Sequence, residues 1–438
     1  MAICGKFRTG IGRRNLLGSP APPQEQNMRM KWLLLCAIGL VPIACSGGGG
    51  SSGEPGPVDT FELGDPIEGL PGAQMAAFLR GKALMQKRFT PSEGAGPFYN
   101  ATSCDACHDT PTTGGSAPNY RNFILAGIGP MGSQTPLFDP PGIPSLVVPS
   151  FQGTHGQRPT IPPSQVGLQV TTGVRNAPPL FGVGLFEFVS NATITALSDP
   201  NDADSDGISG RFNRDASLRI GRFGFKSQAN NIESFIRGAA QNQMGMTTNP
   251  VLGNGAIVNH RSLFLPQVAG GQESPTVDAD GVPDPEISTT DFADIIAFNK
   301  FLAPPRRLID TPASLRGELL FDQIGCTSCH LPTIDSSVGP LAAYTDLLIH
   351  DMGTELADNI SMGLPQPSTL SGFTTGSEFR TQPLWGVRMS APYLHDGRAD
   401  TLDDAIRLHG GEGQASRDAY LSLTQPERDD IIAFLEVL

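Results

Sequence analysis

Basic charge and large aromatic residues are scarce in this sequence. The 438 residues include two Trp and five Tyr, and 30 Lys and Arg stand against 43 Asp and Glu, which gives a formal net charge of −13. An acidic chain repels the phosphates of nucleic acid. The composition therefore argues against a nucleic-acid partner and favours a basic or electrostatically steered redox protein.

Cysteines for structural disulfides are also lacking. Of the seven cysteines, four lie in two short motifs, and the other three, Cys4, Cys36 and Cys45, all lie within the first 45 residues. No pair is left to cross-link the folded body, so its stability must come from packing or from a bound group.

A hydrophobic run long enough to span a membrane is missing as well. Residues 32–43 form a short apolar run after a basic start, and Ala44, Cys45 and Ser46 follow it. The run is too short for a comfortable transmembrane helix and favours a secretory signal. It resembles a bacterial lipoprotein signal with Cys45 as the lipidated residue. We expect a signal segment over 1–45, a flexible linker over 46–65, a location in the periplasm or cell envelope, and membrane contact only through a lipid anchor.

Glycine and proline are abundant. The chain holds 52 Gly and 39 Pro, while 39% of its residues are hydrophobic. This hydrophobic content can fill two or three cores, and the turn residues indicate long loops. We predict a mainly α fold with long loops.

Two Cys-x-x-Cys-His motifs, Cys104 to His108 and Cys326 to His330, carry the strongest chemical signal. Two thiols at this spacing add to the vinyl groups of one haem, and the adjoining imidazole binds its iron. Cys104, Cys107, Cys326 and Cys329 are thus predicted haem attachments, with His108 and His330 as iron ligands. The alternatives are a redox dithiol, which does not need the His, and half of a zinc site, which needs further ligands.

The sequence also repeats itself. Asp294-Ile295-Ile296-Ala297-Phe298 returns as Asp430-Ile431-Ile432-Ala433-Phe434, and an Arg-x-x-Pro element at Arg175 returns at Arg380. Each motif follows a predicted helix, over residues 74–88 in one case and from Thr311 to Gly325 in the other. Thr290 and Thr424 are the predicted starts of the closing helices.

The repeats predict two cytochrome c-like haem domains, over residues 66–305 and 306–438. Cys104 and Asp294 are 190 residues apart, while Cys326 and Asp430 are 104 apart. The first half therefore carries 86 extra residues, which we interpret as a large insertion.

From about Gly94 to the C-terminus the chain resembles the di-haem oxidoreductase family of thiol oxidoreductases and peroxidases, which is related to di-haem cytochrome c peroxidases and to the di-haem enzyme of methylamine utilisation. The segments that carry the resemblance are residues 96–100, 199–210, 221–226, 301–305, 348–353, 379–386, 393–399 and 409–412. It implies two covalent haems, peroxide reduction, and electrons from a small exported cytochrome c or copper protein.

The sixth iron ligands are less directly indicated. Related peroxidases place a Met ahead of a Phe-Lys-Val-Pro-like segment, but Glu378 stands there in this chain. We predict Met244 and His350 as ligands. The remaining candidates are Met352, Met389, His155 and His260, while His395 and His409 could hold haem propionates or a loop. For each candidate, a packed or hydrogen-bonded structural role is the alternative.

Peroxide cleavage needs an acid–base group and a positive charge over an open iron. Glu187 lies among apolar residues just after the first Arg-x-x-Pro element, and Arg175 supplies a charge nearby in sequence. We predict Glu187 and Arg175 as catalytic residues. The alternative is a structural salt bridge of Glu187 with Arg175 or Arg222.

Asp202, Asp204 and Asp206 alternate ahead of Gly207, a spacing that Ca²⁺ loops use. Asn213 replaces the closing Glu of a full EF-hand. We predict a Ca²⁺ site here, with Asp278 to Gly281 as a weaker candidate.

Together these observations predict an exported di-haem peroxidase-type oxidoreductase. Because the extra residues include Glu187 and Met244, we assign catalysis to the first haem and electron entry to the second. A di-haem oxygenase or protein-modifying oxidase and a non-catalytic electron-transfer protein remain as alternatives.

Overall fold

The computed structural model describes most of the chain beyond the predicted signal segment. The described residues are 62–96, 100–128, 135–136, 170–215, 218–248, 251–253, 256–258, 282–358, 360–363 and 374–438. All of them belong to one compact unit, Thr60–Leu438. The predicted signal segment and Cys45, His155, His260 and the weaker acidic turn lie outside the described residues.

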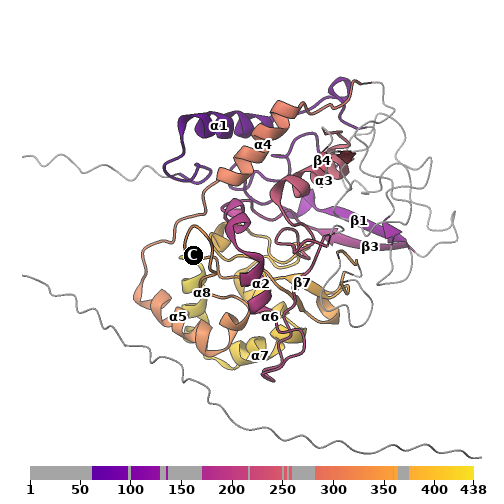
Figure 1. Cartoon of the computed structure of the whole chain (residues 1–438). Coiled ribbons are helices and arrows are strands. Elements are labelled where there is room, and N and C mark those ends of the chain that lie inside the picture. Colours follow the sequence, from indigo (N-terminus) through magenta and orange to yellow (C-terminus); the bar gives the residue numbers. More distant parts are fainter. Residues whose placement is uncertain are drawn as a thin grey trace, which may run out of the picture. The chain divides into compact units, whose positions relative to one another are not determined.

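The first motif follows helix α1 (Gly72–Gln86), which packs against helix α4 (Thr289–Phe301) (Figure 1). The helices touch where Gly81 meets α4, because a Cβ at Gly81 would overlap the carbonyl oxygen of Asp294. Beside this crossing, Arg80 forms a two-pronged ion pair with the Asp294 carboxylate at 2.6 and 2.8 Å. The glycine thus permits the close approach, and the ion pair fixes its register.

The second motif follows helix α5 (Pro312–Gln323), which packs in the same way against helix α8 (Gln425–Leu435) (Figure 1). A Cβ at Gly317 would overlap the carbonyl oxygen of Asp430, and Arg316 pairs with that Asp at 2.7 and 2.6 Å. The two repeats found in the sequence therefore form the same helix crossing twice.

The helix starts follow capping chemistry. Thr311 and Thr424 each cap their helix through a capping box with Pro at the start, as predicted. The start of α4 differs from the prediction, since its N-cap is Ser288 and not Thr290. The serine hydroxyl accepts the backbone N–H of Asp291 at 3.1 Å, which places the helix start two residues earlier.

Three large hydrophobic clusters and a small one around Ile360 and Met362 fill the described interior. One surrounds the first motif and includes Phe78, Phe298 and the partly buried Cys104. Another surrounds the second motif and includes Phe434 and the partly buried Cys326. The third combines residues 183–236 with residues 334–348 and Trp385. The extra residues of the first half therefore share a core with the second half, across the predicted domain boundary at 305/306.

The other described elements are helix α3, which is as long as α4, and shorter segments. Their bounds are η1 (Pro91–Glu93), η2 (Asn119–Arg121), β1 (Phe123–Ile128), β2 (Thr135–Pro136), β3 (Val170–Arg175), η3 (Val183–Phe188), α2 (Asn191–Leu197), α3 (Ile232–Met244), β4 (Val251–Gly253), β5 (Ala256–Val258), η4 (Cys326–Ser328), β6 (Ile349–Asp351), η5 (Thr354–Leu356), β7 (Glu378–Arg380), η6 (Val387–Met389), α6 (Leu402–Leu408), η7 (Gly411–Gly413) and α7 (Gln414–Ser422).

Sheet structure is limited to three small antiparallel assemblies in the described residues. The strand orders are β2-β1-β3, β4-β5 and β6-β7. In the last, His350 lies opposite Phe379. The prediction of a helix-rich fold with long loops is thus confirmed, while the division into two cytochrome-like domains with an insertion stays a prediction. Among the described helices, none combines the length and apolar character that crossing a bilayer requires.

The two Arg-x-x-Pro elements meet at one place. Each ends in a glycine with positive φ, Gly182 at +70° and Gly386 at +68°. A Cβ at Gly182 would press on Pro304 and Trp385, and one at Gly386 would press on Pro305. The two Arg-x-x-Pro elements therefore pack against adjacent prolines, and this contact brings the two halves of the chain together.

Candidate functional site

In the first motif, a backbone carbonyl orients the His108 ring through Nδ1. His108 Nδ1 lies 3.1 Å from the carbonyl oxygen of Gly115, and since a carbonyl only accepts, Nδ1 carries the hydrogen. Burial lowers the pKa of His108, in spite of hydrogen bonds to the Gly115 and Pro178 backbone. The ring is therefore neutral, with Nε2 as its free lone pair, which is the form that binds iron.

The second motif repeats this arrangement. His330 Nδ1 lies 3.0 Å from the carbonyl oxygen of Tyr344, and burial lowers the pKa of His330 to about 4. Backbone hydrogen bonding to a ring nitrogen is the usual way in which proteins orient a metal-binding imidazole. Both proximal histidines thus have the tautomer that haem ligation needs.

The motif cysteines have the properties of attachment sites and not of a redox dithiol. All four are free, and burial raises the pKa of Cys104 and of Cys326 to about 12 and that of Cys107 to about 11. A reactive dithiol needs a lowered pKa, because the thiolate is the nucleophile. These raised pKa values therefore argue against the redox-dithiol alternative.

A buried arginine also suits a haem carboxylate. Arg380 donates through Nε to the Gly224 carbonyl at 3.0 Å and through Nη2 to Gln382 at 2.7 Å, but its buried Nη1 has no hydrogen-bond partner among the described residues. Burial lowers the pKa of Arg380 to about 10. A buried guanidinium N–H without an acceptor is costly, and a porphyrin carboxylate would satisfy it. The residues present therefore fit two c-type haems.

Met244 lies beside the first motif. It ends helix α3, is 2% exposed, and belongs to the cluster that includes Cys104. Met85 and Met246 are buried in the same cluster, so three thioethers surround this site. The assignment of Met244 as an iron ligand stays a prediction, with its position in the right core.

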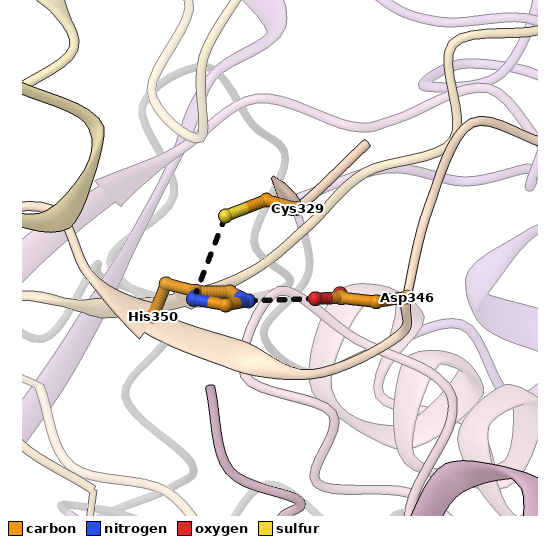
Figure 2. A group of neighbouring side chains, drawn as sticks. All are labelled: Cys329, Asp346 and His350. Carbon is orange, nitrogen blue, oxygen red and sulfur yellow. Dashed lines mark hydrogen bonds and ion pairs between the residues drawn. The ribbon is translucent and has the colours of Figure 1, made fainter. Parts of the chain in front are cut away.

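His350 lies against the second motif, between two carboxylates. Figure 2 shows its ring between Cys329 and Asp346. Nε2 lies 2.8 Å from Asp346 Oδ2, while Nδ1 lies 2.7 Å from Glu412 Oε2 and 3.7 Å from Cys329 Sγ. Burial lowers the pKa of His350, but the charge of Asp346 and hydrogen bonds to Asp346, Cys329 and Glu412 outweigh it and raise this pKa well above its usual value. Both ring nitrogens thus face carboxylates, and the assignment of His350 as an iron ligand stays a prediction.

His409 is a candidate ligand to which the sequence reasoning gave only a minor role. Its Nδ1 lies 2.7 Å from the carbonyl oxygen of Ala405, the same orientation that His108 and His330 have. Burial lowers the pKa of His409, so its ring is neutral like those of His108 and His330. The signal in the sequence was the His-Gly-Gly-Glu segment at residues 409–412.

Two other candidates, Met352 and Met389, have no ligand-like contact in the described residues. A Cβ at Gly413 would lie 3.4 Å from the Met352 methyl and 3.3 Å from the His409 ring, so Met352 packs close to His409. Met389 ends η6, and its methyl lies 3.3 Å from where a Cβ of Gly386 would be.

Glu187 and Arg175 have different partners. Glu187 Oε2 pairs with Lys300 Nζ at 2.8 Å, and Oε1 accepts the backbone N–H of Ile232, at the start of α3, at 3.0 Å. Arg175 is 2% exposed and forms a close ion pair with Asp358. The described contacts thus do not join the two predicted catalytic residues, and the salt bridge of Glu187 is with Lys300, whereas the sequence suggested Arg175 or Arg222.

A buried charged cluster surrounds Phe379, next to Arg175. Lys226 is fully buried, lies 4.1 Å from the Phe379 ring centre and donates to the carbonyl oxygen of Glu378 at 2.7 Å. Burial lowers the pKa of Lys226 to about 8. His395 also stacks on Phe379, with the two ring centres 4.1 Å apart. Burial lowers the pKa of His395 to about 3. His395 is therefore a neutral packing residue of this cluster.

The acidic loop brings its three carboxylates together. Asp202, Asp204 and Asp206 offer oxygens that lie within 4.8 Å of one another. Each also accepts a backbone N–H of the loop, for example Gly207 N to Asp202 Oδ1 at 3.1 Å. The geometry is compatible with the predicted cation site and does not by itself require an ion.

Known proteins share this sequence pattern. Residues 164–438 match the family model described as "Di-haem oxidoreductase, putative peroxidase". The methylamine utilization protein MauG of Methylorubrum extorquens is 30% identical over 129 residues, 28% of this chain and 33% of that protein. Cytochrome-c peroxidase IdrP1 of a Pseudomonas species is 26% identical over 174 residues, 33% of this chain and 44% of that protein. The chain thus spans less than half the length of these curated relatives.

Solved structures give a weaker likeness. The di-haem peroxidase BthA of Burkholderia thailandensis is 17% identical at a TM-score of 0.37, with 83% of this chain and 86% of that chain covered. A MauG-like protein associated with microbial copper homeostasis is 17% identical at a TM-score of 0.36, with 87% and 94% covered. The match of the family model covers more than half of the sequence and includes the second haem motif. The chain therefore belongs to the di-haem oxidoreductase family, whose members carry two c-type haems.

Proposed function

We propose that this protein is an exported di-haem peroxidase that reduces hydrogen peroxide with electrons from a small exported cytochrome c or copper protein. The overall reaction consumes one peroxide, two protons and two electrons and yields two waters. The observation that carries the proposal is the pair of Cys-x-x-Cys-His motifs in which a backbone carbonyl holds each histidine through Nδ1. That arrangement prepares two Nε2 atoms for iron.

Two haems, when bound, supply the redox centre that takes up electrons and the iron that binds the oxidant. Cys104 and Cys107 would hold the first haem covalently, His108 would bind its iron, and Met244 lies in the surrounding core. Cys326, Cys329 and His330 would hold the second. We propose that His409 would also bind the second iron in place of His350, because Nδ1 of His409 donates to a backbone carbonyl and the lone pair is then on Nε2.

Glu187 is the proposed proton acceptor and donor. Its carboxylate is fixed by Lys300 and by the N-terminus of α3, the helix that ends at Met244. This positioning would let Glu187 hold a proton at a defined place at the start of α3, and Lys300 would supply the positive charge that Arg175 was predicted to give. Arg175 instead anchors Asp358 in the buried cluster.

The test combines haem content with turnover. The purified holoprotein should contain two covalent haems per chain and oxidise reduced cytochrome c or a reduced copper protein when peroxide is added. Glu187→Gln should lower the turnover about 100-fold or more while the haem content stays at two. Glu233→Gln is the matched control, since Glu233 is a half-exposed partner of Arg237 on the same helix. Equal turnover of the wild type and Glu187→Gln would refute the role of Glu187.

A protein-modifying oxidase is the second candidate function. The likeness to MauG, a methylamine utilization protein, favours it. In that case, the oxidised holoprotein would alter a protein substrate in the presence of peroxide, and no small electron donor would sustain multiple turnovers of peroxide. Steady-state assays with and without the donor distinguish the two functions. Two six-coordinate irons that do not react with peroxide would instead indicate an electron-transfer protein.

We also propose Ca²⁺ at Asp202, Asp204 and Asp206, on the basis of their spacing and proximity. Incubation with a chelator should then lower the thermal stability, and added Ca²⁺ should restore it. Unchanged melting curves would refute the site. Export and lipid anchoring at Cys45 are proposals from the sequence alone, and fractionation of wild type and Cys45→Ala would test them.

A further inference from the structure

His350 has no part in the peroxidase proposal, yet it is among the most constrained side chains near the second motif. It is 3% exposed and contacts residues from three separate segments: Cys329, Asp346 and Glu412. A buried imidazole that is not needed for ligation and still has three polar contacts calls for a function.

The contacts define its protonation. Carboxylates that accept hydrogen bonds have no hydrogen to give, so each ring nitrogen must carry one. Glu412 accepts three further donors besides His350: the Ser209 N–H at 3.1 Å, the Ser209 hydroxyl at 2.8 Å and the Asp351 N–H at 3.2 Å. A carboxylate with four donors is ionised. His350 is therefore an imidazolium between two carboxylates.

This cation lies at the edge of the second haem site. Cys329 Sγ, which would become the thioether sulfur, is 3.7 Å from His350 Nδ1 (Figure 2). Reduction adds an electron to the haem, so a nearby buried cation stabilises the reduced form and raises its potential. Without the cation, Asp346 and Glu412 would direct uncompensated negative charge towards the haem.

The first half of the chain positions this residue. Ser209 holds Glu412, and a Cβ at Gly210 would lie 2.6 Å from His350 Cε1, so the loop that follows the acidic cluster closes directly over the ring. The same loop continues into Arg211, which bonds the backbone of Ile349 at 3.0 Å. A segment from the half that holds the first motif thus determines where a charge lies beside the second motif.

We propose that His350 is a charged positioning residue that raises the reduction potential of the second haem, and that residues 209–211 hold it in place. The inference rests on the proposed attachment of haem at Cys326 and Cys329. It assigns to His350 a role other than iron ligation, and it makes the loop from the first half a determinant of how readily the second haem accepts electrons.

The test uses His350→Gln in the full-length holoprotein. Redox titration followed optically should show a lower midpoint potential for the second haem and an unchanged one for the first. The electron paramagnetic resonance signals and the count of two covalent haems should stay as in the wild type. Comparison with Cys104→Ala/Cys107→Ala, which retains only the second haem, assigns the signals.

Two further variants separate charge from structure. His350→Arg keeps a positive charge and should move the potential back towards that of the wild type. Gly210→Ala forces the ring away from its place and should lower the potential of the second haem in the same direction by a smaller amount. Gly72→Ala is the matched control, since a Cβ there meets nothing within 4 Å and should leave both potentials unchanged.

The outcomes distinguish the possibilities. An unchanged potential in His350→Gln, or an Arg variant that behaves like Gln, refutes the charge role. A changed paramagnetic signal of the second haem identifies His350 as an iron ligand and refutes the inference as well. A wild-type protein with no haem at Cys326 and Cys329 refutes the proposed haem attachment on which the inference depends.

Discussion

The helix pairs α1/α4 and α5/α8 pack in the same way. Each places a glycine against the backbone of the closing helix, at Asp294 in one pair and Asp430 in the other, and an Arg next to that glycine binds the Asp carboxylate. Local packing is therefore repeated even though the two halves differ by 86 residues in length. The scaffold that presents a Cys-x-x-Cys-His motif is shared.

The surroundings of the two motifs differ. Buried Met85, Met244 and Met246 line the first core, whereas buried Tyr344 and Tyr420 line the second. Charged groups also collect at the second motif, where His350 lies between two carboxylates. The same helix scaffold thus has an apolar, thioether-rich environment at the first motif and a charged environment at the second. This is the arrangement expected for two haems with different tasks.

Removal of the thiols should have the largest effect and tests whether the two motifs are equivalent attachment sites. Cys104→Ala/Cys107→Ala and Cys326→Ala/Cys329→Ala should each lose one of two covalent haems, because each motif binds its haem independently through thioether bonds. Intact-protein mass spectrometry and the alkaline pyridine spectrum measure the count. A double variant that retains both haems would contradict the attachment assignment.

Substitution of the glycines at the two helix crossings should have the second largest effect, and it tests whether the two helix pairs pack equivalently. Gly81→Ala and Gly317→Ala should each destabilise the fold by about 3 kcal/mol, because the new methyl group overlaps a helix carbonyl that cannot move freely. Denaturant unfolding of the holoprotein measures the loss, with Gly72→Ala as the neutral control. A large loss in only one of the two would show that the crossings are not equivalent.

Stability should also depend on pH through Lys226. This residue lies in the buried cluster with Arg175, from the first Arg-x-x-Pro element, and Phe379, which precedes the second. Burial lowers the pKa of Lys226 from 10.5 to about 8, so between these pH values the unfolded state binds more protons than the folded state. Stability therefore rises with pH over this window and is lost as the pH falls through it.

The measurement compares wild type with Lys226→Met. Relative to the variant, the wild type should gain up to about 3 kcal/mol of unfolding free energy between pH 8 and pH 10.5. Parallel pH profiles of the two proteins would show that Lys226 is charged in the folded state over the whole range.

The surface ion pairs of the two crossings should have the smallest effect. Arg80 is 57% exposed and Arg316 59%, so solvent screens both pairs strongly. Arg80→Ala and Arg316→Ala should lower the melting temperature slightly and equally, and high salt should remove most of the difference. A large or unequal loss would mean that the pairs do more than fix the register of the crossing.

Much of the fold could be read from local patterns. The helices before and after each motif were predicted within a few residues, because capping residues such as Thr311 and Thr424 and the repeated Asp-Ile-Ile-Ala-Phe segment act locally. The N-cap at Ser288 was missed, since Thr290 offers the same hydroxyl two residues later. Where two residues have equal capping chemistry, only the packing of the helix decides between them.

The candidate site was less accessible from the sequence. Proximity along the chain suggested that Arg175 could serve Glu187, but Asp358 and Lys300 are their partners, from 183 and 113 residues away. His350 was predicted to bind iron because it is a histidine in a family segment. The two carboxylates that occupy its nitrogens come from residues 346 and 412, and no spacing rule connects them.

The sequence by itself determined the covalent chemistry of this protein: two Cys-x-x-Cys-His motifs, their proximal histidines and the duplicated helices that frame them. These features depend on residues that are neighbours in the chain, where bond geometry leaves few choices. Tertiary structure decided which charges meet, which imidazole keeps a free nitrogen, and that a loop of the first half closes over a residue of the second. Such contacts join distant segments, and only packing selects among the many partners that the composition allows.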